Sequence, residues 1–188
     1  GFTNKQLIKL GEEEIRTVED FAGLNIRVEE NPAHVATMRA LGASATPLPW
    51  GEVATALATG LADGQFNAPA VSASFKLWEV NDYTTWTGHV YNTLAWMVSE
   101  EWLRKQTPEH RVVIVAAARE AIPIGHGIAA HLSVLGWAES CEKFKECHVL
   151  DEAERTRMRD ITRPAFKAWI TDNFGIPAAD VDAFWNEV

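Results

Sequence analysis

The sequence predicts an α/β fold with a mostly parallel sheet, and three observations support this prediction. Segments with strand character alternate with segments of helical apolar spacing, in the order strand, helix, strand, helix, strand. The connections between them are short. Apolar residues make up 47% of the 188 positions, which suffices for a packed domain without disulfide or metal staples. Because strands joined through helices form right-handed crossovers, we expect a βαβαβ unit.

The first elements have clear local boundaries. Thr17 and Asp20 occupy the first and last positions of a capping-box-like start, and Gly23 ends the very short helix that follows. Residues 24–28 alternate and become β-branched, which predicts the first strand of the unit.

The next helix is framed by its capping residues. Asn31 is a strong N-cap, Pro32 suits the first helical position, and Gly42 suits the position after the last turn. The rest of the unit follows in order as a strand at residues 45–48, a helix from Val53 to Leu61, a turn at Asp63 and Gly64, and a strand at residues 65–67.

The second half of the chain is predicted to be mainly helical. Residues 71–80 indicate a helix, and residues 83–98 indicate two strands or one bent strand. The remaining helices are expected from Thr107 toward Phe144, over residues 151–173 and over residues 178–187.

The long helix after Thr107 contains Pro123, Gly125 and Gly127, and we expect these residues to kink or break it. As domains, we expect an α/β ligand-binding lobe over residues 1–100, and the long and C-terminal helices over residues 101–188.

Composition and motifs exclude several function classes. The net charge of -9 opposes attraction to nucleic acid. The longest apolar runs, residues 112–118 and 128–130, are interrupted well short of the ~20 residues of a membrane span. The chain contains no Gly-x-Ser-x-Gly, Gly-x-Gly-x-x-Gly, Gly-Lys-Ser/Thr or His-Glu-x-x-His motif. We therefore expect no enzyme, no catalytic residue, no cofactor and no metal.

Other chemically suggestive residues have simpler interpretations. Glu29 and Glu30 are adjacent and fit a surface loop, and His126 and His131 are not spaced to share a helix face. Most of the eight tryptophans are expected to be packing residues, among them Trp78, Trp96, Trp137, Trp169 and Trp185.

Candidate ligand contacts gather where the predicted strands end. Arg27 to Asn31 follow the first strand, Trp50 follows the second, and Asn67 ends the third. Because ligands of open parallel sheets bind outside the carboxyl ends of the strands, these side chains are expected to converge. A guanidinium, an indole and a carboxamide suit a small organic anion. A strand-end arginine that is only a solvated surface charge is the alternative.

Four motifs in order resemble the DctP-type substrate-binding proteins of TRAP transporters. They are Thr-Val-Glu-Asp-Phe-Ala-Gly-Leu-Asn-Ile-Arg-Val at residues 17–28, Leu-Gly-Ala-Ser-Ala-Thr-Pro at 41–47, Trp-Gly-Glu-Val-Ala-Thr-Ala-Leu at 50–57 and Gly-Leu-Ala-Asp-Gly-Gln-Phe-Asn at 60–67. Residues 87–92 and 97–99 continue the likeness, as does the helix after Pro108.

The resemblance implies a site and a setting. It implies that Arg27 binds the substrate carboxylate, that Asn67 contacts ligand and that Trp50 lines the pocket. Asn31 and His89 are further candidates, although His89 is equally expected to be a structural histidine. The implied fold is one lobe of a periplasmic binding protein that closes on its ligand. The implied setting is the periplasm, reached with a signal peptide in the precursor, and the implied partners are TRAP membrane permease subunits.

Members of this family carry an N-terminal lobe before the segment that matches Phe2-Thr3-Asn4. We therefore expect this chain to be the C-terminal part, whose helices brace the other lobe, and to require either a companion lobe or self-association. A periplasmic sensory or interaction module that binds the same small carboxylate is the alternative to transport.

Cys141 and Cys147 form a possible disulfide, because the implied compartment is oxidising. Six residues of helix would separate their Cα atoms by ~9 Å, so a disulfide requires the helix to end between them.

Overall fold

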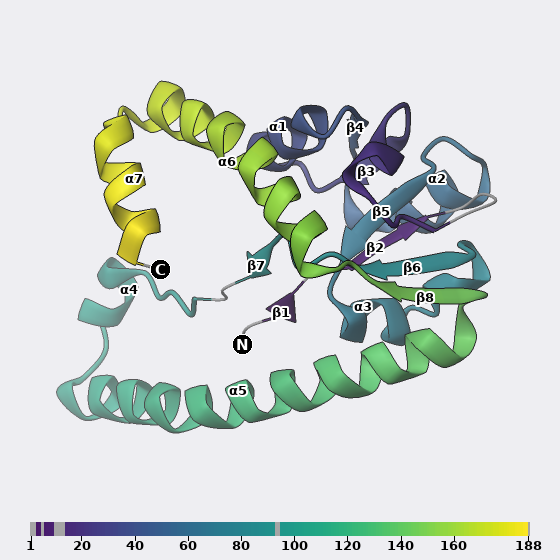
Figure 1. Cartoon of the computed structure of the whole chain (residues 1–188). Coiled ribbons are helices and arrows are strands. Elements are labelled where there is room, and N and C mark those ends of the chain that lie inside the picture. Colours follow the sequence, from purple (N-terminus) through teal and green to yellow (C-terminus); the bar gives the residue numbers. More distant parts are fainter. Residues whose placement is uncertain (1–2, 5, 10–13, 93–94, 188) are drawn as a thin grey trace.

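The structure is a computed structural model that describes residues 3–4, 6–9, 14–92 and 95–187 (Figure 1). Its centre is a six-stranded sheet in the order β4-β3-β5-β2-β6-β8. The strands are β2 (Gln6–Lys9), β3 (Asn25–Val28), β4 (Ser44–Pro47), β5 (Gly64–Asn67), β6 (Tyr83–Trp86) and β8 (Glu146–Val149). A separate antiparallel pair joins β1 (Thr3–Asn4) to β7 (Tyr91–Asn92).

The predicted βαβαβ unit is confirmed as β3, α1 (Pro32–Ala40), β4, α2 (Val53–Ala58) and β5, with β3 parallel to both β4 and β5. Its helix boundaries have the expected causes. The Asn31 side chain accepts a hydrogen bond from the Ala33 amide at 2.9 Å, and Gly42 has a φ of 82° after the last turn of α1. A short 3-10 helix (Val18–Phe21) precedes β3, and a second (Trp50–Glu52) leads into α2.

Two strands of the sheet were not predicted from local pattern. β2 pairs antiparallel with both β5 and β6, which makes the sheet mixed. β8 enters from the far end of the chain and pairs parallel with β6. Both strands are short and derive their pairing from distant segments, so the sheet is completed by contacts that no sequence window contains.

Helices cover both faces of the sheet (Figure 1). On one face, Ile26, Val28 and Phe66 form an apolar core with Met38 of α1 and Met158 of α6 (Glu152–Phe174). On the other face lie α3 (Pro69–Ser74) and α5 (Pro108–Lys143), and Trp86 of β6 packs edge-on against Trp137 of α5 at 4.9 Å.

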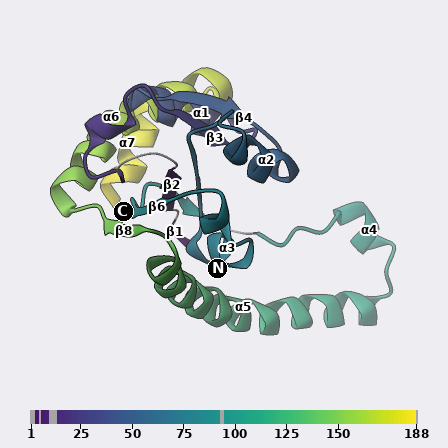
Figure 2. The ribbon, with the colours of Figure 1, turned by 90° about the vertical axis from the view of Figure 1, so that its right-hand side faces the viewer.

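The expected break at Pro123 is wrong: α5 is one continuous helix of 36 residues with Pro123 inside it. A proline removes one hydrogen bond and crowds one carbonyl, a penalty of about 3 kcal/mol that the remaining turns of a long helix can absorb. In Figures 1 and 2, α5 runs without interruption along one side of the molecule and extends far beyond the sheet.

Much of α5 has an exposed apolar surface. Nine of its large hydrophobic side chains are exposed, namely Val112, Val113, Val115, Ile122, Ile124, Ile128, Leu132, Val134 and Leu135. One window of α5 reaches a mean hydropathy of 1.4, so in length and composition this helix is apolar enough to cross a membrane. From the sequence we expected no membrane-spanning segment, because we counted only uninterrupted apolar runs. A protein that packs against α5 would bury the same apolar surface.

Three smaller differences concern the middle of the chain. The helix expected over residues 71–80 divides into α3 and a 3-10 helix (Leu77–Glu79), because Lys76 between them has a φ of 49°. Trp96, expected to pack, is 72% exposed. A short α4 (Glu100–Arg104) precedes α5, and α7 (Ala178–Glu187) follows α6 as expected.

A disulfide joins the end of α5 to the edge of the sheet. Cys141 and Cys147 are bonded, with Cα atoms 4.9 Å apart. Such a short separation is possible because α5 ends at Lys143, between the two cysteines, and the chain then turns into β8.

We expect replacement of both cysteines by serine to lower the free energy of unfolding by about 2 kcal/mol, since the bond restricts a short loop of the unfolded chain. Urea unfolding of the double variant and the parent measures this difference. Titration of the unreduced, unfolded parent provides the check on the bond itself: two reactive thiols would contradict it.

Candidate functional site

The carboxyl ends of three neighbouring parallel strands meet at one edge of the sheet. Arg27 lies near the end of β3, Trp50 follows β4, and Asn67 is the last residue of β5. Since β3 lies between β4 and β5, the three side chains start from adjacent positions.

Arg27 is held in one orientation by a backbone carbonyl. Its Nε and Nη2 donate to the oxygen of Leu48 at 3.0 and 2.6 Å, and the residue is only 2% exposed. The contacts come from the segment after β4, so the guanidinium leans toward β4 and away from β5. Its Nη1 and the second N–H of Nη2 remain for another acceptor.

The charge of Arg27 is retained although the residue is buried. Burial lowers the pKa of the guanidinium, and the neighbouring carboxylates Glu29 and Glu30 oppose that shift. An arginine stays protonated at neutral pH under such conditions. The edge therefore presents a fixed, partly desolvated cation, which is suited to a carboxylate.

Trp50 lies beside this cation, and Asn67 ends the neighbouring strand β5. The Trp50 ring lies 5.8 Å from Cζ of Arg27 and packs edge-on against Phe75 at 4.9 Å, which fixes it as an apolar wall. The Asn67 side-chain oxygen accepts from the Ala68 amide at 3.0 Å, and this contact orients the carboxamide.

Asn31 and His89 do not join this group. Asn31 serves as the N-cap of α1, and His89 Nδ1 is hydrogen-bonded to the Thr87 hydroxyl at 2.6 Å. The His89 ring packs on Phe66, which belongs to the opposite face of the sheet from Arg27. Of the five predicted contacts, the structure brings Arg27 and Trp50 together, places Asn67 at the end of the strand next to that of Arg27, and places Asn31 and His89 on a second surface.

That second surface is a cavity of about 1010 Å³ between α1, the segment after β6, and the helices α6 and α7. Besides Asn31 and His89 it is lined by basic and aromatic side chains, including His34, Arg155, Arg159, Arg163, Phe166, Trp169 and Trp185. The three arginines were not predicted, although their spacing of four residues along one helix face is visible in the sequence.

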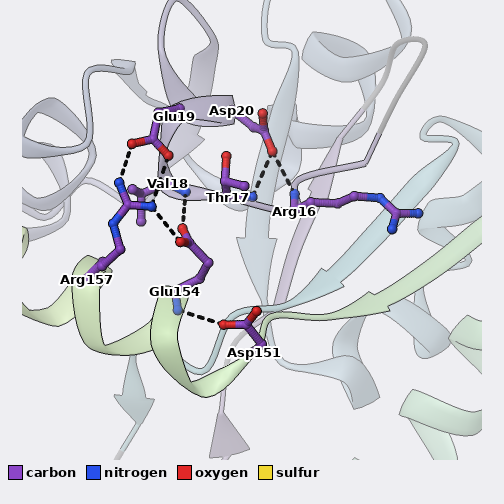
Figure 3. A network of polar contacts seen from close by, with 8 residues as sticks. All are labelled: Arg16, Thr17, Val18, Glu19, Asp20, Asp151, Glu154 and Arg157. Atoms are coloured by element: carbon purple, nitrogen blue, oxygen red, sulfur yellow. Dashed lines mark hydrogen bonds and ion pairs between the residues drawn. The ribbon is translucent and has the colours of Figure 1, made fainter.

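A polar network fixes α6 against the start of the βαβαβ unit (Figure 3). Glu154 of α6 accepts from the Val18 amide at 2.9 Å, and its own amide donates to Asp151 at 2.8 Å. Arg157 pairs with both Glu154 and Glu19, and this pairing holds the pKa of the Glu19 carboxyl below its usual value. The cavity wall is therefore anchored to the same unit that carries Arg27.

No group of three or more histidine, cysteine, aspartate or glutamate residues in the described part of the chain could hold a metal ion. The arrangement at the sheet edge is one for binding: a positioned cation, an apolar wall and an amide at the end of parallel strands. It defines the class of the protein as an α/β ligand-binding lobe.

The chain belongs to the bacterial extracellular solute-binding proteins of family 7, the DctP family, whose model matches residues 3–172. It is 36% identical over 162 residues to the ectoine-binding periplasmic protein TeaA of Halomonas elongata, covering 86% of this chain and 46% of that protein.

Solved structures of TRAP solute-binding proteins have a similar fold. A TRAP periplasmic solute-binding protein of Ralstonia eutropha with bound (S)-2-acetolactate superimposes with a TM-score of 0.84 at 28% identity, covering 92% of this chain and 56% of that one. A TRAP solute-binding protein of Ochrobactrum anthropi gives 0.84 at 33% identity, covering 98% and 57%. The chain thus spans about half the length of the relatives it matches.

Proposed function

We propose that this chain is the ligand-contacting part of a TRAP-type solute-binding protein that captures a small organic acid through Arg27. The observation that carries the proposal is the buried guanidinium, oriented by the Leu48 carbonyl at the sheet edge. No ion pair joins Arg27 to a carboxylate among the described residues, so its remaining N–H groups can serve a ligand.

The ligand class follows from the three side chains and is supported by the relatives. A carboxylate would pair with Arg27, Trp50 would cover its carbon skeleton and Asn67 would bind a polar substituent. The Ralstonia structure holds an acid, and TeaA is named for ectoine. Asn31 and His89 remain candidates for a larger ligand that reaches the second surface.

The proposed setting is the periplasm, with delivery of the ligand to TRAP membrane permease subunits. Relatives named periplasmic support this location. A periplasmic sensory module would bind the same acid but dock onto a receptor. Co-purification of the permease subunits with the tagged protein would favour transport, and co-purification of a receptor would favour the alternative.

The test of ligand class is a thermal-shift screen of the intact protein against organic acids, with matched neutral amides as controls. A ligand that binds the native state raises the melting temperature by mass action. We expect shifts with carboxylates only. Equal shifts with an acid and its amide would contradict the role of Arg27.

We further propose that a companion lobe covers the exposed apolar surfaces of this chain. α5 carries exposed apolar side chains and extends far beyond the sheet (Figure 1), and Trp102 of α4, Ile176 before α7 and Phe184 of α7 are exposed as well. Surfaces of this kind associate with protein in water.

The 188-residue chain alone is therefore expected to self-associate and to bind acids weakly. Light scattering and calorimetry measure both properties. A clean monomer that binds an organic acid tightly would contradict the need for a companion.

A further inference from the structure

One face of α5 points away from the rest of the molecule. Gly136 and Ser140 are the buried residues of this helix, and a Cβ atom at Gly136 would meet Ala70 of α3, so these positions mark its inner face. With about 3.6 residues per turn, the positions half a turn away form the outer face. In Figures 1 and 2, α5 forms the lower margin of the molecule, and the sheet, α4 and α7 all lie above it. The outer face therefore points away from the sheet and from the side on which a companion lobe would cover α4 and α7.

The outer face of α5 carries a regular row of residues. Eight positions follow one another in alternating steps of four and three, a spacing that keeps them on one side of a helix and is typical of paired helices. All eight residues are exposed, and six of them are apolar or glycine. They are Val113, Ala117, Glu120, Ile124, Gly127, His131, Val134 and Ala138, and we call this row the outer seam. An exposed apolar row of this kind is suited to pairing with another protein surface.

The outer seam is complementary to itself in the reverse direction. When a second copy lies antiparallel, the first position of one seam meets the last position of the other, and the second meets the next to last. The four pairs are then Val113 with Ala138, Ala117 with Val134, Glu120 with His131, and Ile124 with Gly127. A larger side chain meets a small residue in three pairs, and an acid meets a base in the fourth.

The complementarity is specific to the antiparallel direction. In a parallel pair each residue would meet its own copy, so Glu120 would repel Glu120 and Gly127 would leave a gap opposite Gly127. Opposite Ile124, by contrast, the space at Gly127 is open, because a Cβ atom there meets nothing within 4 Å. Alanine is the small residue in two of the other pairs, so a methyl group at Gly127 is also compatible with the seam.

We propose that the outer seam joins two copies of the protein as an antiparallel helix pair related by a two-fold axis. A two-fold interface requires one surface that is complementary to itself, which is the property of the outer seam. The exposed side chains of Ile128 and Leu135 flank the seam and add apolar area. The seam spans ~38 Å, so the interface is small among specific protein contacts, and a dissociation constant in the micromolar range is expected.

A lipid surface is the other occupant that an apolar helix suggests, and α5 is apolar enough to cross a membrane. The outer seam places Glu120 and His131 among its apolar residues, however. In lipid these two polar side chains would lose water without gaining a partner, whereas in the antiparallel pair each is the partner of the other. The sequence of the seam therefore favours a second copy.

The test measures dimerisation of the intact protein, with its companion lobe, by sedimentation velocity over a range of concentrations. His131→Glu places a carboxylate opposite Glu120 twice in each dimer, and we expect it to raise the dissociation constant by about tenfold or more. Adding Glu120→Lys to that variant restores two pairs of opposite charge in reversed order. We expect this double variant to dimerise nearly as well as the parent.

The matched control is Arg119→Glu. Arg119 is an exposed, charged residue of α5 next to Glu120, but it lies outside the outer seam. Its replacement should leave the dissociation constant unchanged. Because all three positions are exposed, the circular dichroism and melting temperature of each variant, measured at dilutions where the parent is monomeric, should match those of the parent.

The outcomes decide between the occupants. An intact parent that stays monomeric at about 100 μM would overturn the proposal, and so would a dimer that His131→Glu leaves unchanged or that the double variant fails to restore. Sedimentation of a monomeric parent with anionic lipid vesicles would assign the seam to a membrane surface instead. Use of the intact protein separates this dimer from the association expected of the 188-residue chain alone. None of these results bears on Arg27, since the outer seam points away from the sheet.

Discussion

Replacing Arg27 with lysine is expected to weaken organic-acid binding by roughly 10- to 100-fold, the value of a charge-assisted hydrogen bond. Arg27 uses Nε and one N–H of Nη2 on the Leu48 carbonyl and still presents further donors. An ammonium group has no planar fork, so it cannot hold the carbonyl and the ligand in the same fixed geometry. Isothermal titration calorimetry with the best acid from the screen measures the loss.

The matched control is Arg39→Lys. Arg39 lies in the last turn of α1 and is exposed, so its replacement should leave affinity unchanged. Because Arg27 is buried, the melting temperature and circular dichroism of Arg27→Lys are recorded as well. A folded Arg27→Lys protein with unchanged affinity for every acid would end the proposed role.

Gly136→Ala is expected to destabilise the protein by about 1–3 kcal/mol, although alanine is the better helix former. Gly136 is buried where α5 crosses α3, and a Cβ atom there would lie 2.7 Å from the Cα and N atoms of Ala70. The obstacle is backbone, which cannot rotate away, so the two helices would have to separate.

Gly127→Ala in the same helix supplies the control with the opposite sign. A Cβ atom at Gly127 meets nothing within 4 Å, so only the helix propensity changes, and stability should rise by about 1 kcal/mol. Urea unfolding measures both variants. Equal stabilisation by the two substitutions would show that α3 and α5 do not make the close contact described.

The local signals of the sequence predicted the βαβαβ unit correctly, because each depends on near neighbours. Asn31 and Pro32 open α1 through contacts within one turn, and Gly42 ends it through its own backbone freedom. The meeting of Arg27 and Trp50 followed from the same unit, since parallel strands bring their carboxyl ends to one edge.

Long-range contacts decided the rest. β2 and β8 form through pairing with segments far away in the chain, and α5 continues through Pro123 because the rest of a long helix outweighs one lost hydrogen bond. The separation of His89 from Arg27 depends on which sheet face each occupies.

By itself, the sequence determined the crossover unit, the residues at the ends of its strands and the resemblance that places the chain in its family. Only the tertiary structure decided which of those residues share a site, and that the outer seam of α5 points away from the sheet. The physical reason is that capping and periodicity are properties of consecutive residues. Burial and orientation depend on strand register and on helices packed from distant parts of the chain.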